Sequence, residues 1–217
     1  MPLAVVALLC YLLGSLPFAH AITRLVTGQS IREVGEGNVG ARNVAVTVGR
    51  LAGVATALLD ALKGAAACLL ALRAGGSPVT LLVAGLAVML GHGFPIWLRF
   101  RGGIGLGTAS GFMAVLFPIT LLAAVPVFYL LYRLWANYEF MLTAGFVAIL
   151  LGSLAERGSL PLTGVAVAML ALSGLKRLLD DRHRRTVQAR SGWVEPTPDF
   201  DAWLNGSQGR NRSGRGR

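Results

Sequence analysis

The chain has 217 residues and a formal net charge of +10; 54% of its residues are apolar and only 14% are charged. An ordinary soluble domain carries about 25% charged residues, so the composition excludes that class and predicts an all-α protein, a polytopic bundle of membrane helices. Cys10 and Cys68 both lie in apolar runs without polar neighbours. The sequence therefore suggests neither a disulfide framework nor a metal site, and we expect no cofactor.

Six apolar segments follow one another along the chain. The first has no basic region before it and contains a Gly-Ser-Leu-Pro break at 14–17, so we interpret it as a retained span rather than a signal peptide. A helix needs about 20 apolar residues to cross a bilayer, and most of the segments reach this length. The segments are residues 2–24, 51–72, 78–98, 105–132, 140–155 and 160–176.

Segment 105–132 is too long for a single crossing. As one helix it would extend roughly 42 Å, well beyond a hydrocarbon core of ~30 Å, and Pro118 and Pro126 interrupt it. Basic residues gather in the first and third connections and in the tail from Lys176 onward. Because cytoplasmic connections are enriched in Lys and Arg, we predict that 105–132 doubles back as two short or broken helices. This gives about seven transmembrane helices, with the N-terminus outside and the C-terminus in the cytoplasm.

Two glycine-rich stretches interrupt the apolar pattern, GEGNVGARN at 35–43 and GHGFPIWLRFRGGIGLGT at 91–108. Glycines expose backbone amides that bind anions, Arg and Asn add side-chain donors, and the amino end of a helix adds a positive dipole. The predicted topology places both stretches on one side of the membrane, so we predict a shared phosphate site. Its candidate binding residues are Gly37, Asn38, Gly40, Arg42, Arg101, Gly102, Gly103, Gly105, Gly107 and Thr108.

A plainer interpretation applies to each stretch alone. Glycines in membrane helices often serve close packing, and basic residues at a membrane edge often only set topology. His92 by itself could be part of a polar helix end. Asp60 and Lys63 lie three residues apart inside an apolar segment, so they share a helix face, and we predict a structural ion pair.

These motifs together resemble a known family. Gly14-Ser15-Leu16-Pro17, GEGNVGARN, Asp60 with Lys63-Gly64, GHGFPIWLRFRGGIGLGT and Arg182-His183-Arg184 follow the order and spacing of the bacterial acyl-phosphate-dependent glycerol-3-phosphate acyltransferases. The resemblance implies a seven-helix enzyme of the bacterial inner membrane. It would transfer an acyl chain from acyl phosphate to the 1-hydroxyl of glycerol 3-phosphate, giving lysophosphatidic acid. It also makes His183, Asn43 and His92 the candidate catalytic residues.

The sequence departs from the family pattern at several polar positions. Glu36 and Arg42 stand where the family usually has Ser and Thr, and Val46 stands where it has Arg. Ile104 replaces the Lys of a GGKG motif, and Thr186 replaces an Asn. An alternative is therefore a catalytically impaired or substrate-shifted relative that binds lipid or phosphate, or regulates a partner. A small transporter or channel is a third possibility for a polytopic chain.

The chain divides into two parts. Residues 1–190 form the predicted membrane domain, and residues 191–217 form a tail rich in Gly and Arg whose composition predicts disorder. Arginine at this density binds anionic lipid headgroups or RNA, but we expect a solvated tail and no specific nucleic acid. The expected partners are acyl phosphate, glycerol 3-phosphate or a related polyol phosphate, and membrane lipids, with the protein a monomer.

Overall fold

The computed structural model describes residues 1–135 and 138–193, and this part is helical throughout, with short connections. Two short 3₁₀ turns, Ile31–Glu33 and Ile96–Leu98, lie in the connections that carry the glycine-rich stretches. The α-helices are α1 (Leu3–Gly14), α2 (Phe18–Thr27), α3 (Ala41–Thr47), α4 (Arg50–Arg73), α5 (Pro78–Gly93), α6 (Leu106–Leu116), α7 (Pro118–Trp135), α8 (Tyr138–Arg157) and α9 (Leu160–Ser191).

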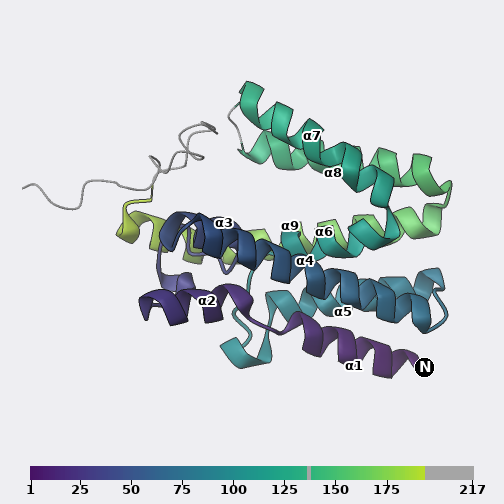
Figure 1. Cartoon of the computed structure of the whole chain (residues 1–217), viewed down its shortest axis with the longest axis horizontal. Coiled ribbons are helices and arrows are strands. Elements are labelled where there is room, and N and C mark those ends of the chain that lie inside the picture. The colour runs from purple at the N-terminus through teal and green to yellow at the C-terminus, as the bar shows by residue number, and fades with distance from the viewer. Residues whose placement is uncertain (136–137, 194–217) are drawn as a thin grey trace, which may run out of the picture.

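The helices make seven passes within the described residues, as predicted. Helices α1 and α2 run end to end as one broken span, and each of α4 to α9 makes one further pass in alternating direction (Figure 1). Four of these units are long and apolar enough to cross a membrane, and α6 and the first part of α7 are shorter apolar helices. An odd number of passes places the start of α1 and the end of α9 at opposite ends of the bundle.

The predicted break in segment 105–132 lies between α6 and α7. Helix α6 ends at Leu116 and α7 begins at Pro118, which lacks the amide hydrogen that would continue the first helix. Two side chains from the end of α8 satisfy the exposed backbone: Glu156 accepts hydrogen bonds from the amide (2.8 Å) and hydroxyl (2.7 Å) of Thr120, and Arg157 donates to the Leu116 carbonyl. The interruption predicted at Pro126 is wrong, because α7 continues through it.

Glycines set how closely the helices of the core approach. A Cβ on Gly64 of α4 would overlap the Thr108 carbonyl of α6, and one on Gly111 of α6 would overlap the Ala61 carbonyl of α4. The backbones of α4 and α6 are therefore in direct contact, which brings their polar residues together. Around this contact the core is apolar, with Val88, Phe112, Phe117, Val165 and Met169 almost fully buried.

Helix α9 is longer than the sequence predicted. Its apolar part was expected at 160–176, but the helix continues to Ser191, a length of roughly 48 Å. The second half therefore extends past the core to the end of the bundle where α2 and α3 lie (Figure 1). Of the predicted tail, residues 194–217 lie outside the described part of the chain.

Candidate functional site

The first glycine-rich stretch, residues 35–43, is a loop wrapped around one asparagine. Gly35 and Gly37 have positive φ values of 59° and 74°, a region that favours glycine, and the chain turns there. The Asn43 side chain is fully buried inside the turn. Its Oδ1 accepts from the Glu36 amide (2.9 Å), and its Nδ2 donates to three backbone carbonyls at 3.0 Å. This geometry favours an organising role for Asn43 over the predicted catalytic one.

Helix α9 closes over this loop. A Cβ on Gly37 would lie 3.0 Å from the Cβ of Val187, so α9 passes directly above the loop. The Ser191 hydroxyl donates to the Gly35 carbonyl (2.9 Å), and Gln188 Nε2 donates to the Glu36 carbonyl (3.5 Å). The loop and the helix thus form one unit.

Glu36 is buried between two arginines at the same place. It is 3% exposed. Its Oε1 accepts a hydrogen bond from Arg184 Nη2 (2.6 Å), and its Oε2 lies 3.3 Å from Arg42 Nη1. Arg42 also lies over the ring of Trp193. The substitutions at positions 36 and 42 therefore compensate each other in charge, and Arg42, predicted to bind phosphate, pairs with a carboxylate of the chain itself.

The second glycine-rich stretch, residues 91–108, folds back on the end of α5. The Gly102 amide donates to the Gly93 carbonyl (3.0 Å), and the Gly103 amide donates to the His92 carbonyl (3.2 Å). These two amides, predicted to bind phosphate, are thus used within the protein. Gly105 has a φ of 91° and precedes α6, whose first turn has no side-chain cap. Arg101 is exposed beside this turn.

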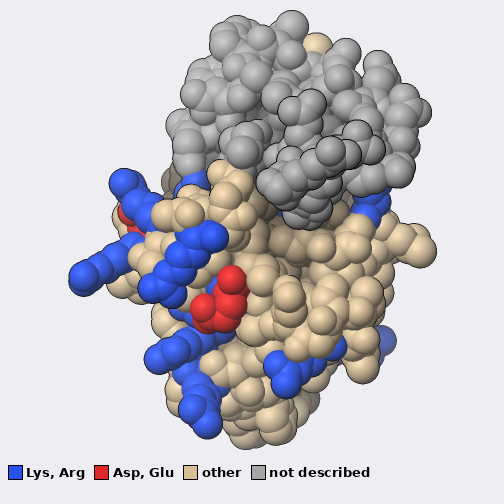
Figure 2. Space-filling view, turned by 90° about the vertical axis from the view of Figure 1, so that its left-hand side faces the viewer, with Lys and Arg blue, Asp and Glu red and all other residues tan. Residues whose placement is uncertain are grey.

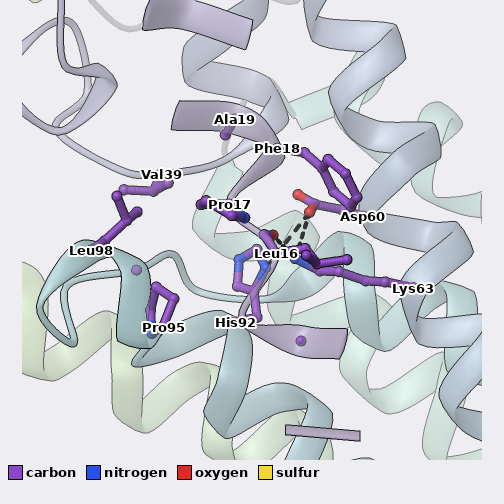
Figure 3. A pocket seen from close by; sticks show the side chains of 12 residues that line it. Leu16, Pro17, Phe18, Ala19, Val39, Asp60, Lys63, His92, Pro95 and Leu98 are labelled. Atoms are coloured by element: carbon purple, nitrogen blue, oxygen red, sulfur yellow. Dashed lines mark hydrogen bonds and ion pairs between the residues drawn. The ribbon is translucent and has the colours of Figure 1, made fainter. Parts of the chain in front are cut away.

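A pocket lies where the break between α1 and α2 meets α4, α5 and the second stretch (Figure 3). Its polar side chains are Asp60, Lys63 and His92. The remaining lining residues are Gly14, Leu16, Pro17, Phe18, Ala19, Val39, Pro95, Leu98 and Gly102.

The polar side chains of the pocket form one buried cluster. Lys63 Nζ lies 2.8 Å from Asp60 Oδ1, and it also donates to the Leu16 carbonyl (3.2 Å). His92 Nδ1 lies 3.7 Å from Asp60 Oδ1 (Figure 3), and it lies 3.3 Å from the Thr108 hydroxyl. The opposite ring nitrogen, Nε2, faces the Gly103 α-carbon, where an added Cβ would be 2.6 Å away. The Nδ1 edge of the imidazole thus lies beside polar side chains, and the Nε2 edge lies against the second glycine-rich stretch.

His183 lies outside this pocket. Its Nε2 is 3.1 Å from the Arg32 carbonyl, to which it donates, and it is half-buried on α9. Arg32 in turn contacts Asp180 of α9 (3.6 Å) and donates to the Gly102 carbonyl (3.4 Å). Asp180 also pairs with Lys176, which is 4% exposed. This chain of contacts connects α9, through Arg32, to the second glycine-rich stretch.

The sequence analysis did not predict that the second half of α9 packs against the loops of the site. The contacts come from Lys176, Asp180, His183, Arg184, Val187, Gln188 and Ser191. These positions recur every three or four residues, so they share one helix face. That spacing is present in the sequence, and it could have predicted a helix with one buried, largely polar face.

Basic side chains surround this end of the molecule. Figure 2 views the end of the bundle where α2, α3 and the end of α9 lie, and Lys and Arg side chains gather there around a small acidic patch. Exposed arginines include Arg24 on α2, Arg182 and Arg185 on α9, and Arg99 and Arg101 in the second glycine-rich stretch. Among the described residues, no group of three or more His, Cys, Asp or Glu side chains is placed to hold a metal ion. The gathering of Lys and Arg side chains makes this end of the molecule suited to anions.

Comparison with known proteins identifies the family. A family model described as "Glycerol-3-phosphate acyltransferase" matches residues 4–188. The chain belongs to this family. It is 43% identical over 159 residues to the glycerol-3-phosphate acyltransferase of Gluconobacter oxydans, covering 69% of this chain and 75% of the relative. It is 35% identical over 195 residues to that of Roseobacter denitrificans, covering 89% and 93%.

Solved structures agree with the sequence comparisons. The fold matches the crystal structure of PlsY, an integral membrane glycerol 3-phosphate acyltransferase, in its glycerol 3-phosphate form, with a TM-score of 0.75 and 29% identity over 86% of this chain and 93% of that one. The lysophosphatidic acid form matches with a TM-score of 0.70. The predicted family, fold and enzyme class, a membrane-embedded acyltransferase, are confirmed.

Proposed function

We propose that this chain transfers an acyl group from acyl phosphate to the 1-hydroxyl of glycerol 3-phosphate. The carbonyl–phosphate bond of the mixed anhydride breaks, an ester forms at the hydroxyl oxygen, and inorganic phosphate and lysophosphatidic acid leave. The family match over residues 4–188 carries the proposal. The buried polar cluster at the junction of the two glycine-rich stretches supports it.

Acyl phosphate is already activated, so the reaction requires alignment and proton transfer rather than a nucleophilic side chain. His92 is the best-placed base among the predicted catalytic residues. Asp60 and Thr108 lie on the Nδ1 side of its ring, so we assign acceptance of the hydroxyl proton to Nε2, the nitrogen that packs against Gly103. We assign the phosphate groups to Arg101 and the first turn of α6 at Gly105 to Thr108, because a helix amino end favours anions.

The test uses purified protein in detergent with palmitoyl phosphate and labelled glycerol 3-phosphate, and measures lysophosphatidic acid by chromatography. His92→Gln should lower kcat by about 10²- to 10⁴-fold, the usual contribution of a general base. His183→Gln is the matched control and should lower it less, because His183 contacts the Arg32 backbone outside the pocket. Full activity in His92→Gln would show that His92 is not the base, but it would not contradict the proposed reaction. Absence of product with every polyol phosphate would overturn the function itself.

A second candidate is a family member that binds phosphate or lipid without catalysis. Ile104 favours it, because this apolar side chain is 7% exposed where the family usually carries Lys. Val46 is exposed on α3, and the Thr186 hydroxyl donates to the Arg182 carbonyl of its own helix. An inactive wild type whose combined Ile104→Lys, Val46→Arg and Thr186→Asn variant forms product would establish this candidate.

The location in the bacterial inner membrane, with the α9 end in the cytoplasm, is part of the same proposal. The gathering of arginine at that end supports it, because cytoplasmic ends are enriched in basic residues (Figure 2). A single cysteine placed at exposed Arg182 in a Cys10→Ala, Cys68→Ala background should resist a membrane-impermeant thiol reagent in intact cells. Labelling of that cysteine in sealed cells would reverse the orientation.

A further inference from the structure

The two-arginine arrangement around Glu36 has the composition of an anion site. Proteins commonly bind carboxylate and phosphate groups with guanidinium groups that point at the same acidic group. Here Arg42 extends from α3 and Arg184 from α9, so two elements far apart in the sequence meet at one point. Arg184 is 7% exposed and Glu36 is 3% exposed, so the contact is shielded from water.

The carboxylate does not satisfy all the donors that face it. Oε1 of Glu36 bonds to Arg184 and Oε2 pairs with Arg42, so each oxygen serves one guanidinium. The Nε of Arg184 is buried and has no hydrogen-bond partner among the described residues. A phosphate group carries more acceptor oxygens than a carboxylate, so it offers an acceptor to this Nε as well as to the two Nη groups. The surroundings are thus better matched to a phosphate than to the group that fills them.

We propose that Arg42 and Arg184 form an anion site that Glu36 fills with its own carboxylate, thereby excluding a phosphate group from it. The proposal concerns the ion pairs themselves and holds whether or not the chain catalyses acyl transfer. It also accounts for how the first glycine-rich stretch and α9 remain joined, since Glu36 holds both arginines in the absence of any ligand. Neutralising Glu36 should convert this internal contact into a phosphate-binding site.

The test compares wild type with Glu36→Gln, which keeps the size of the side chain and removes its charge. Thermal unfolding of each purified protein is followed as inorganic phosphate is titrated at constant ionic strength, because a ligand of the folded state raises Tm with concentration. Glu36→Gln should start less stable than wild type and bind phosphate at least about tenfold more tightly. Glycerol 3-phosphate should give the same gain, because the arginines contact the phosphate group.

Glu33→Gln is the matched control. Glu33 is an exposed carboxylate three residues earlier in the chain, so its variant has the same net charge without opening the two-arginine site. It should bind phosphate as wild type does. Equal phosphate affinity in wild type and Glu36→Gln, or an equal gain in Glu33→Gln, overturns the proposal.

If Glu36→Gln does not fold, chemical labelling of the wild type tests whether Glu36 keeps phosphate out of the site. The Arg42 side chain is 25% exposed and accessible to phenylglyoxal. High concentrations of inorganic phosphate should leave its labelling rate unchanged, because Glu36 keeps phosphate out. Protection of Arg42 by phosphate in the wild type would show that the site accepts phosphate despite Glu36, and would refute the proposal.

Discussion

Asp60 and Lys63 form an ion pair, so substitution of either residue should lower stability strongly. The effects of the two substitutions should also depend on each other. Both residues are 3% exposed, and their charged atoms are 2.8 Å apart. At an effective dielectric constant of 20, the Coulomb attraction at this distance is about 6 kcal/mol. Lys63 also donates to the Leu16 carbonyl in the break between α1 and α2. The pair therefore connects the first span to α4.

Removing one partner should leave the other charge buried without compensation. We expect Asp60→Asn and Lys63→Met each to lower the free energy of unfolding by about 3–5 kcal/mol. The double variant buries no unpaired charge, so it should be much closer to wild type than the sum of the two losses. The expected coupling energy is at least ~2 kcal/mol.

Unfolding in mixed micelles with increasing denaturing detergent measures these free energies for all four proteins. Glu33→Gln serves as a control for charge removal, because Glu33 is exposed. Losses below ~1 kcal/mol in both single variants would show that the pair is solvated rather than buried. Strict additivity in the double variant would show that the two charges do not interact, and either result refutes the reasoning.

Two further predictions concern helix contacts and capping. Gly111→Ala should lower stability by about 1–3 kcal/mol in the same assay, because its Cβ would overlap the Ala61 carbonyl, whereas Gly164→Ala, with nothing within 4 Å, should not. Equal losses would show that the close approach of α4 and α6 is not required. Glu156→Gln should speed hydrogen exchange at the Thr120 amide, because a neutral amide caps the start of α7 more weakly than a carboxylate. Unchanged exchange would contradict that capping role.

Part of the site was predictable because local sequence decides it. The Asp60 to Lys63 spacing places both side chains on one face of any helix, so their pairing followed from helix geometry alone. The break at Pro118 followed from the missing amide of proline. The Pro126 prediction failed because a proline inside an apolar segment does not by itself end a membrane helix.

The roles of Asn43, Gly102 and Gly103 were not predictable from the sequence. Their residue types suit an anion site, but the Asn43 amide and the two glycine amides bond to backbone carbonyls of neighbouring segments. Whether a polar group faces a ligand or the protein depends on which segment packs beside it. A motif specifies which polar groups are present, but not whether they point toward a ligand or toward the rest of the protein.

By itself, the sequence determined the class of this protein. Apolar segment lengths and the placement of basic residues are set by the thickness and charge asymmetry of a membrane, so composition and spacing sufficed for an all-helical bundle of about seven spans. The ordered motifs sufficed for the family. These properties depend on residues close in the chain or on totals along it.

Only the tertiary structure decided how the polar residues are grouped. It placed His92 in the pocket and His183 outside it, although the resemblance made both candidate catalytic residues. It also joined Glu36 to the nearby Arg42 and to Arg184, which lies 148 positions away in the sequence. The physical reason is that α9 extends beyond the core and folds over both glycine-rich stretches, which brings distant charges to contact distance. Those contacts determine which cations at this end are paired within the protein.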